Sequence, residues 1–179
     1  MSKAELNGGI IMETKLRKRC ISLFVENEVG VLAYISGLFS GKSYNLDSLT
    51  VGTTIDPSVS RMTITLTSDD RTFEQIKKQL NRSVPVIRVV DLTGADIFMK
   101  ELMYAKVTEC EDADLKKIAR LGRAHGASVV DCVADAILLE CVGTERENDV
   151  LLDKLKKSFP ERVEIVRGGN VAIESLPAK

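Results

Sequence analysis

The order of apolar patterns along the chain constrains its fold more than any other feature. Residues 31–39 and 69–80 carry apolar side chains at helical spacing. Alternating apolar residues, which are typical of strands, occupy the remaining segments 19–25, 44–53, 61–68 and 84–92. The resulting order β-α-β-β-α-β over about residues 17–93 predicts a ferredoxin-like domain, an antiparallel four-stranded sheet with both helices on one face. The other face of that sheet is left uncovered, and Pro85 suits an edge strand because proline lacks the ladder donor.

The second half of the chain repeats this pattern, although not the letters. Helical spacing recurs over residues 112–126 and 147–159, and strand patterns occupy the segments 97–108, 127–133, 136–143, 162–167 and 170–174. Gly168 and Gly169 separate the last two strand patterns and indicate a two-residue hairpin. The predicted fold class is therefore α+β, with two ferredoxin-like βαββαβ domains in tandem, the second of them carrying an extra terminal strand. We place the domains at residues 17–94 and 95–179, and we expect residues 1–16 to form a flexible N-terminal extension.

Composition excludes several classes of function. The net charge is −1 and aromatic residues make up 4% of the chain, which argues against nucleic acid as a partner. No apolar run approaches the roughly 20 residues of a membrane span, and the N-terminus lacks the apolar core of a secretory signal. We therefore expect a cytoplasmic protein with no membrane partner.

Neither the cysteines nor the histidine indicate catalysis or metal binding. Cys20, Cys110, Cys132 and Cys141 form no CxxC pair, so we expect reduced thiols that pack as small apolar groups, with redox or metal roles as the weaker alternatives. His125 lies at the end of a predicted helix, without a phosphate-binding loop or a neighbouring nucleophile in sequence. The sequence therefore predicts a protein that is not an enzyme and has neither a cofactor nor a metal of its own.

The loop before the first helix, "ENEVG", has features of a binding site. Helix N-termini carry unpaired amides that attract carboxylates, and Gly30 allows the backbone to approach a ligand closely. The side chain of Asn27 both donates and accepts, and Asn45 begins the next strand. The candidate site residues are Asn27, Gly30, Val31, Leu32, Asn45 and Leu46. The same residues also fit a structural interpretation in which Asn27 caps the helix, Asn45 holds a turn, and the nearby acidic side chains oppose an anion.

Residues 24–64 closely resemble the N-terminal ACT domain of the small regulatory subunit of acetolactate synthase (acetohydroxyacid synthase). The segments "ENEVGVL", "GLFS", "YNLDSLTV" and "SRMTI" carry this resemblance. The segments "FEQIKKQLNRSVPVIRVVDL" and "ELMYAKV" extend it, and it covers about residues 17–175, more loosely after residue 110. Where the family has Arg-Gly before the Tyr-Asn pair, this chain has Lys42 and Ser43, so the position of Asn45 could differ.

The resemblance implies a regulatory protein that binds valine or a related branched-chain amino acid. ACT domains of this family pair side by side into a homodimer, and the effector binds where they meet. Asn27, Gly30, Val31 and Leu32 would come from one subunit, and Asn45 and Leu46 from the other. The partner would be the catalytic large subunit, which uses thiamine diphosphate, Mg²⁺ and FAD. The small subunit raises its activity and confers feedback inhibition. The alternative is a stand-alone ACT-type amino-acid sensor that acts on another enzyme or regulator.

Overall fold

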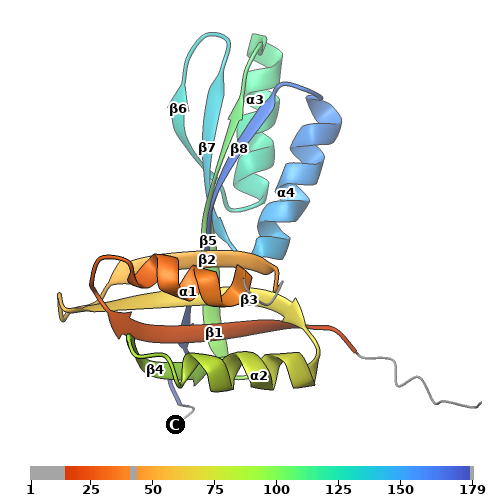
Figure 1. The fold of residues 1–179 in the computed structure, drawn as a ribbon. Coiled ribbons are helices and arrows are strands. Elements are labelled where there is room, and N and C mark those ends of the chain that lie inside the picture. The colour runs from red at the N-terminus through yellow and green to blue at the C-terminus, as the bar shows by residue number, and fades with distance from the viewer. Residues whose placement is uncertain (1–14, 41–43, 178–179) are drawn as a thin grey trace, which may run out of the picture.

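The structure is a computed structural model that describes residues 15–40 and 44–177 (Figure 1). The predicted flexible extension lies almost wholly outside the described residues, and so do Lys42 and Ser43. The N-terminal domain comprises β1 (Arg17–Glu26), α1 (Val31–Ser40), β2 (Leu46–Thr53), β3 (Val59–Ser68), α2 (Asp70–Leu80) and β4 (Val86–Asp91). The C-terminal domain comprises β5 (Ile97–Val107), α3 (Asp112–Ala124), β6 (Ser128–Cys132), β7 (Ile137–Gly143), α4 (Glu145–Ser158) and β8 (Val163–Glu174).

The N-terminal domain is the predicted ferredoxin-like unit. Its antiparallel sheet has the order β2-β3-β1-β4, so β4, which follows Pro85, is an edge strand as expected. Alternate residues of β1 and β3 are buried under α1 and α2, because successive strand side chains point to opposite faces. The core residues that meet there include Ile21, Leu23, Val25, Ile35, Met62, Ile64, Leu66, Phe73 and Ile76.

The C-terminal domain has the same topology, with the sheet order β6-β7-β5-β8. Its core gathers one face of β5 and β7 under α3 and α4, and it includes Met103, Ala105, Val107, Ile118, Ile137, Leu139, Leu151, Leu155 and Phe159. Within the described residues, no helix is long and apolar enough to cross a membrane.

The predicted hairpin at Gly168–Gly169, and with it the extra terminal strand, is wrong. β8 is one continuous strand that pairs with β5 along its length. Arg167 pairs with Met103 and Asn170 pairs with Glu101, so two glycines of β8 lie opposite a single residue of β5. This arrangement is a β-bulge, in which glycine accepts the unusual backbone easily, and Gly169 has a φ of 80°.

The bulge sits where the two domains meet. The ends of β5 and β8 extend beyond their own helices and pass behind the N-terminal sheet, on the face opposite α1 and α2 (Figure 1). Cys20, Leu92 and Ala172 form a small shared apolar cluster there. The sheet face that was predicted to be uncovered is therefore partly covered by the ends of β5 and β8. It is lined by hydroxyl groups such as those of Ser22, Thr63 and Thr65, all of which are buried.

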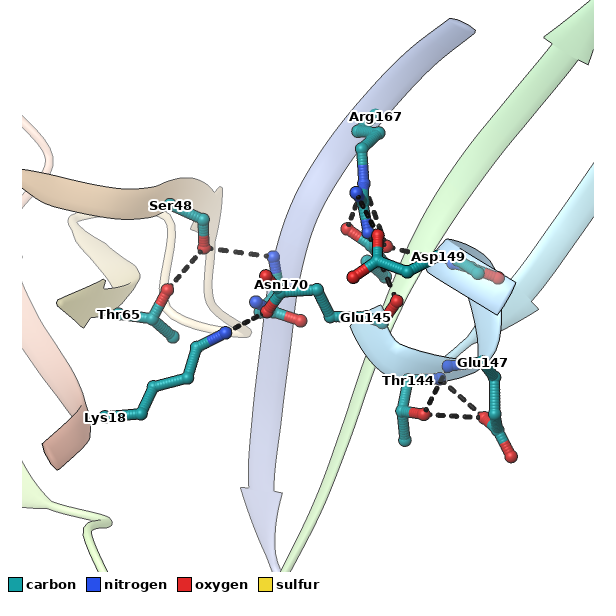
Figure 2. Close-up of polar contacts among 11 residues, drawn as sticks. Lys18, Ser48, Thr65, Thr144, Glu145, Glu147, Asp149, Arg167 and Asn170 are labelled. Carbon is teal, nitrogen blue, oxygen red and sulfur yellow. Dashed lines mark hydrogen bonds and ion pairs between the residues drawn. The ribbon is translucent and has the colours of Figure 1, made fainter. Parts of the chain in front are cut away.

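Polar groups of β2 and β3 connect this face to β8. The Thr50 hydroxyl donates to the Asn170 carbonyl at 2.7 Å. The Asn170 amide donates to the Ser48 hydroxyl at 3.3 Å, as Figure 2 shows. The Arg61 guanidinium donates to the Ala172 carbonyl at 2.9 Å. An ion pair between Lys18 and Glu145 adds a further link between the domains (Figure 2). The domain contact thus combines a small apolar cluster with polar links, and the two hydroxyl groups that bond to β8, those of Ser48 and Thr50, come from β2.

Candidate functional site

The loop between β1 and α1 is open at the glycine that the sequence singled out. Gly30 is exposed and has a φ of 91°, in the region that side-chain-bearing residues rarely adopt. A Cβ built on Gly30 would meet no atom within 4 Å. The glycine is therefore required by its own backbone conformation, and the space beside it is free.

The N-terminus of α1 presents backbone donors that have no acceptor among the described residues. The first helical hydrogen bond runs from the Tyr34 amide to the Gly30 carbonyl at 2.8 Å, which leaves the amides of Leu32 and Ala33 without a helical acceptor. The first turn holds no acidic residue, and no side chain of the described residues accepts from these two amides. The positive end of the helix dipole therefore lies open to an anionic ligand.

The other three helices differ from α1 in this respect. The carboxylate of Asp69 accepts from the Thr72 amide at the start of α2. Thr144 and Glu147 form a capping box at the start of α4 (Figure 2), and hydrogen bonds from Thr144, with Lys100, lower the pKa of Glu147 to about 2. Asp114 accepts from the Glu111 amide at the start of α3. Each of these helix ends is occupied by the protein's own oxygen atoms.

Asn27 has a structural role in addition to any binding role. Its Nδ2 donates to the Pro57 carbonyl at 2.9 Å, and its Oδ1 accepts from the Ser60 hydroxyl at 3.0 Å. These bonds join the glycine loop to the turn between β2 and β3, so Asn27 does not cap α1. An amide side chain can form further hydrogen bonds, so one N–H and one lone pair of Asn27 stay available.

The remaining candidates fall into two groups at opposite ends of α1. Val31 is buried in the core and Leu32 is 46% exposed at the start of the helix. Asn45 is exposed and Leu46 half-buried beyond its other end. Ten helical residues span about 15 Å, so one chain does not bring the two groups together.

Sequence reasoning missed part of this arrangement. The amide of Ala33 belongs to the open helix end, but any residue type supplies a backbone amide, so no letter marks it. The acceptor at Pro57 and the donor at Ser60 are likewise distant in sequence from Asn27. The only available signal was the glycine before an apolar helix that lacks a capping side chain.

The cysteines and the histidine show no catalytic arrangement. Cys20, Cys110 and Cys141 are buried as predicted, whereas Cys132 is exposed. Burial raises the pKa of Cys141 to about 11, which keeps this thiol protonated at neutral pH. His125 caps the C-terminus of α3, and its Nε2 lies 2.8 Å from the Lys154 ammonium, which can only donate. In the described part of the chain, no cluster of three or more His, Cys, Asp or Glu residues could hold a metal ion.

Comparisons with known proteins assign both halves of the chain to one family. Residues 21–88 match the family model described as an AHAS small subunit-like ACT domain. Residues 100–176 match the model described as the small subunit of acetolactate synthase. The second match is informative because it covers the domain in which the resemblance was weaker.

Individual relatives agree with this assignment. The chain is 35% identical over 158 residues to the acetolactate synthase small subunit of Buchnera aphidicola subsp. Schizaphis graminum, covering 87% of this chain and 98% of the relative. It is 35% identical over 156 residues to the Haemophilus influenzae acetolactate synthase small subunit, covering 87% and 94% of the two chains. The crystal structure of the acetolactate synthase small subunit from Thermotoga maritima superimposes with a TM-score of 0.81 at 28% identity, covering 90% of this chain and 99% of that chain. The chain therefore belongs to the acetolactate synthase small-subunit family, and its role is regulatory rather than catalytic.

Proposed function

We propose that this chain binds the catalytic large subunit of acetolactate synthase, raises its activity and makes it sensitive to inhibition by valine or a related branched-chain amino acid. The observation that supports an effector site is the open N-terminus of α1 beside Gly30. The other three helices do not have such an open start. The observation that favours this partner over the stand-alone ACT-type sensor is the family match of the second domain. The thiamine diphosphate, Mg²⁺ and FAD would reside in the large subunit, and the assembly would act in the cytoplasm.

A free amino acid matches the chemistry of this loop. Its carboxylate would accept hydrogen bonds from the amides of Leu32 and Ala33 at the positive end of α1. Its ammonium would donate to the remaining lone pair of Asn27. An aliphatic side chain would contact Leu32, which is 46% exposed in the single chain.

The second half of the site would come from a paired ACT domain. β2 is an edge strand, so its backbone is free to pair with the same strand of another copy around a two-fold axis. Such pairing would place Asn45 and Leu46 of one subunit near the loop of the other. The effector would then stabilise one arrangement of the pair.

The effect on the catalytic subunit would be allosteric. Valine must bind one arrangement of the regulatory pair more tightly than another, since equal affinity would shift nothing. Strand β2 also contacts the C-terminal domain through Ser48 and Thr50, so a shift of β2 would reach that domain directly. By linkage, the large subunit must change valine affinity by the same factor.

The first experiment measures acetolactate formation by the large subunit of the same source, with and without this chain. We expect a higher rate on addition, reversed by valine. No change in rate together with no association would contradict the proposed function and leave the stand-alone sensor.

The loop is tested by Gly30→Asp, which places a negative charge beside the carboxylate position. We expect loss of valine inhibition with activation retained. Gly94→Asp is the matched control, because Gly94 has a φ of 75° and also has no atom within 4 Å of a built Cβ. Loss of activation in Gly30→Asp, but not in the control, would show that the loop is structural. Asn45→Ala should weaken valine binding, and unchanged binding would remove Asn45 from the site.

A further inference from the structure

The two helices of the C-terminal domain carry a concentration of positive charge. The chain as a whole is nearly neutral, with 25 Lys and Arg residues against 26 Asp and Glu. Four basic residues lie on α3 and four on α4. None of these takes part in an ion pair within the described part of the chain. Average composition therefore does not account for the charge of this helix layer.

Most acidic residues of α3 and α4 pair with cations of other elements. These residues are Asp114, Glu145, Glu147 and Asp149. The remaining two are Asp112 and Asp153, and neither forms an ion pair within residues 15–40 and 44–177. The acidic side chains of the two helices thus neutralise the strands and loops around them, and the positive charge of the helices is left over.

A groove of about 440 Å³ lies between α3 and α4, which run side by side on one face of the C-terminal sheet (Figure 1). Its lining consists mainly of four cations and two small or aliphatic side chains. These are Lys117 and Arg120 from α3, Lys154 and Lys157 from α4, and Leu121 and Ala124. We call it the basic groove. Among the described residues, no acidic side chain lines it.

Two of the four cations are held in position by neutral groups. The Lys117 ammonium lies 5.2 Å from the centroid of the Phe159 ring. The Lys154 ammonium lies 2.8 Å from Nε2 of His125, and because an ammonium can only donate, this nitrogen accepts. Neither neighbour carries a negative charge, so both ammonium groups are oriented without being neutralised. Ordering side chains in advance lowers the entropic cost of binding a partner.

The shape of the basic groove fits a row of carboxylates better than a phosphate group. The lining of α3 extends from Lys117 to Ala124, which is about 10 Å along the helix. The helices line the groove with their sides, so it offers no helix N-terminus to a phosphate. Phe159, the ring beside it, is 1% exposed and offers no face on which a base could stack. Carboxylates at helical or strand spacing around an apolar side chain match this lining.

The position of the basic groove leaves the rest of the molecule accessible. α4 begins beside the N-terminal domain, where Glu145 pairs with Lys18. Lys154 and Lys157 lie in the later turns of α4, about 15 Å farther along the helix (Figure 1). A partner bound there covers neither the open start of α1 nor the edge strand β2.

We propose that the basic groove binds an acidic segment of the catalytic large subunit, in which carboxylates flank at least one apolar side chain. This inference rests on the proposed function, because that function supplies the partner. The carboxylates pair with the four cations, and the apolar side chain contacts Leu121. Attraction between opposite charges speeds the encounter of the subunits, and added salt weakens it.

Charge reversal in the full chain tests the groove. Arg120→Glu with Lys157→Glu should raise the concentration of this chain needed for half-maximal activation of the large subunit at least tenfold. The maximal rate and the circular dichroism spectrum should stay the same. Lys116→Glu with Lys156→Glu is the matched control, because it changes the net charge equally on the same helices outside the groove lining. The control should shift this concentration by less than about twofold, and equal shifts of the two double variants would overturn the inference.

Zero-length cross-linking of the unmodified chain to the large subunit with a carbodiimide gives a second test, which requires association but not activation. Mass spectrometry should find Lys117, Lys154 or Lys157 joined to Asp or Glu of the large subunit. Association with links from other lysines alone would overturn this inference and leave the proposed function standing. No association at all would overturn both. Links from the three groove lysines to a second copy of this chain, and none to the large subunit, would show that the occupant is not the large subunit.

Discussion

The two halves of this molecule share one topology but differ in what they leave open. In the N-terminal domain the first helix begins with amides that have no acceptor within residues 15–40 and 44–177, while the open face of the sheet is lined by hydroxyl groups and partly covered by β8. In the C-terminal domain the equivalent helix α3 begins with Asp112 and Asp114 in its first turn, while the open sheet face is apolar and exposed. The same backbone plan therefore leaves an uncapped helix end in one half and an exposed apolar sheet face in the other.

This difference comes from few residues. A carboxylate in the first turn of a helix occupies the position that an anionic ligand would take. Hydroxyl side chains on a sheet face allow a polar contact that another strand can cover, as Ser48 and Thr50 do with Asn170. Valine and isoleucine at equivalent positions require an apolar cover instead. The shared fold alone would assign neither role. The roles have to be argued from the residues that differ at equivalent positions of the two domains.

The largest expected effect concerns the covered face. A Cβ on Gly169 would lie 2.9 Å from the Thr50 methyl, and its φ of 80° strains any other residue. Gly169→Ala should therefore lower the free energy of unfolding by about 2–3 kcal/mol, measured by urea denaturation. Gly52→Ala, where a Cβ meets nothing within 4 Å, should change it by less than about 0.5 kcal/mol.

A double-mutant cycle sharpens this prediction. Thr50→Ser removes the clashing methyl and keeps the hydroxyl that donates to Asn170. Combined with Gly169→Ala, it should recover about 1 kcal/mol, because the steric part of the loss disappears and the backbone strain remains. Strict additivity of the two changes would mean that the two domains do not meet at this point.

An intermediate effect is expected at the helix ends. Asp69→Ala and Thr144→Ala each remove an accepting side chain at the start of α2 or α4, and each should cost about 1 kcal/mol of unfolding free energy. Neither change should alter inhibition by valine. A loss of valine response in Asp69→Ala would break the distinction between the open helix end and the capped ones.

The smallest effect concerns pH and the C-terminal core. Burial raises the pKa of Cys141 from 9.0 in a free thiol to about 11, so the unfolded chain loses this proton before the folded one does. The corresponding stability is fully present below pH 9 and is lost as the pH rises toward 11. With allowance for solvent screening, we expect a loss below about 1 kcal/mol at pH 10. Cys141→Ala should flatten this part of the stability profile, and Cys132→Ala, at the exposed thiol, should leave it unchanged.

Much of the fold follows from the sequence because side-chain periodicity is strong. Met62, Ile64 and Leu66 alternate with threonine, and Phe73, Ile76 and Leu80 lie on one face of a helix, so burial of these residues leaves little choice of structure. The Gly168–Gly169 pair was misread because a tight turn and a bulge use the same residues. What distinguishes them is whether the flanking segments pair with each other or with β5, and sequence alone does not carry that pairing.

The site was less predictable for two physical reasons. Its donors are backbone amides, which have no sequence letter, and Asn27 is held by groups that lie about 30 residues away. Its two groups of candidate residues lie at opposite ends of α1, so the proposed site would need a second copy of the chain. The polar domain contact was also missed, because isolated serines and threonines show no periodicity.

The bulge in β8 also determines which side of the sheet the following residues of the strand face. In a regular strand Arg167 and Asn170, three positions apart, would point to opposite sides of the sheet, and the extra glycine brings both to the same side. Deleting that single glycine would exchange the two sides of the last residues, turning Val171 and Ile173 toward the hydroxyl-lined sheet and Asn170 and Ala172 toward solvent. The single extra glycine thus decides which side of the sheet each later residue of β8 faces. The docking of one domain on the other depends on this one-residue insertion.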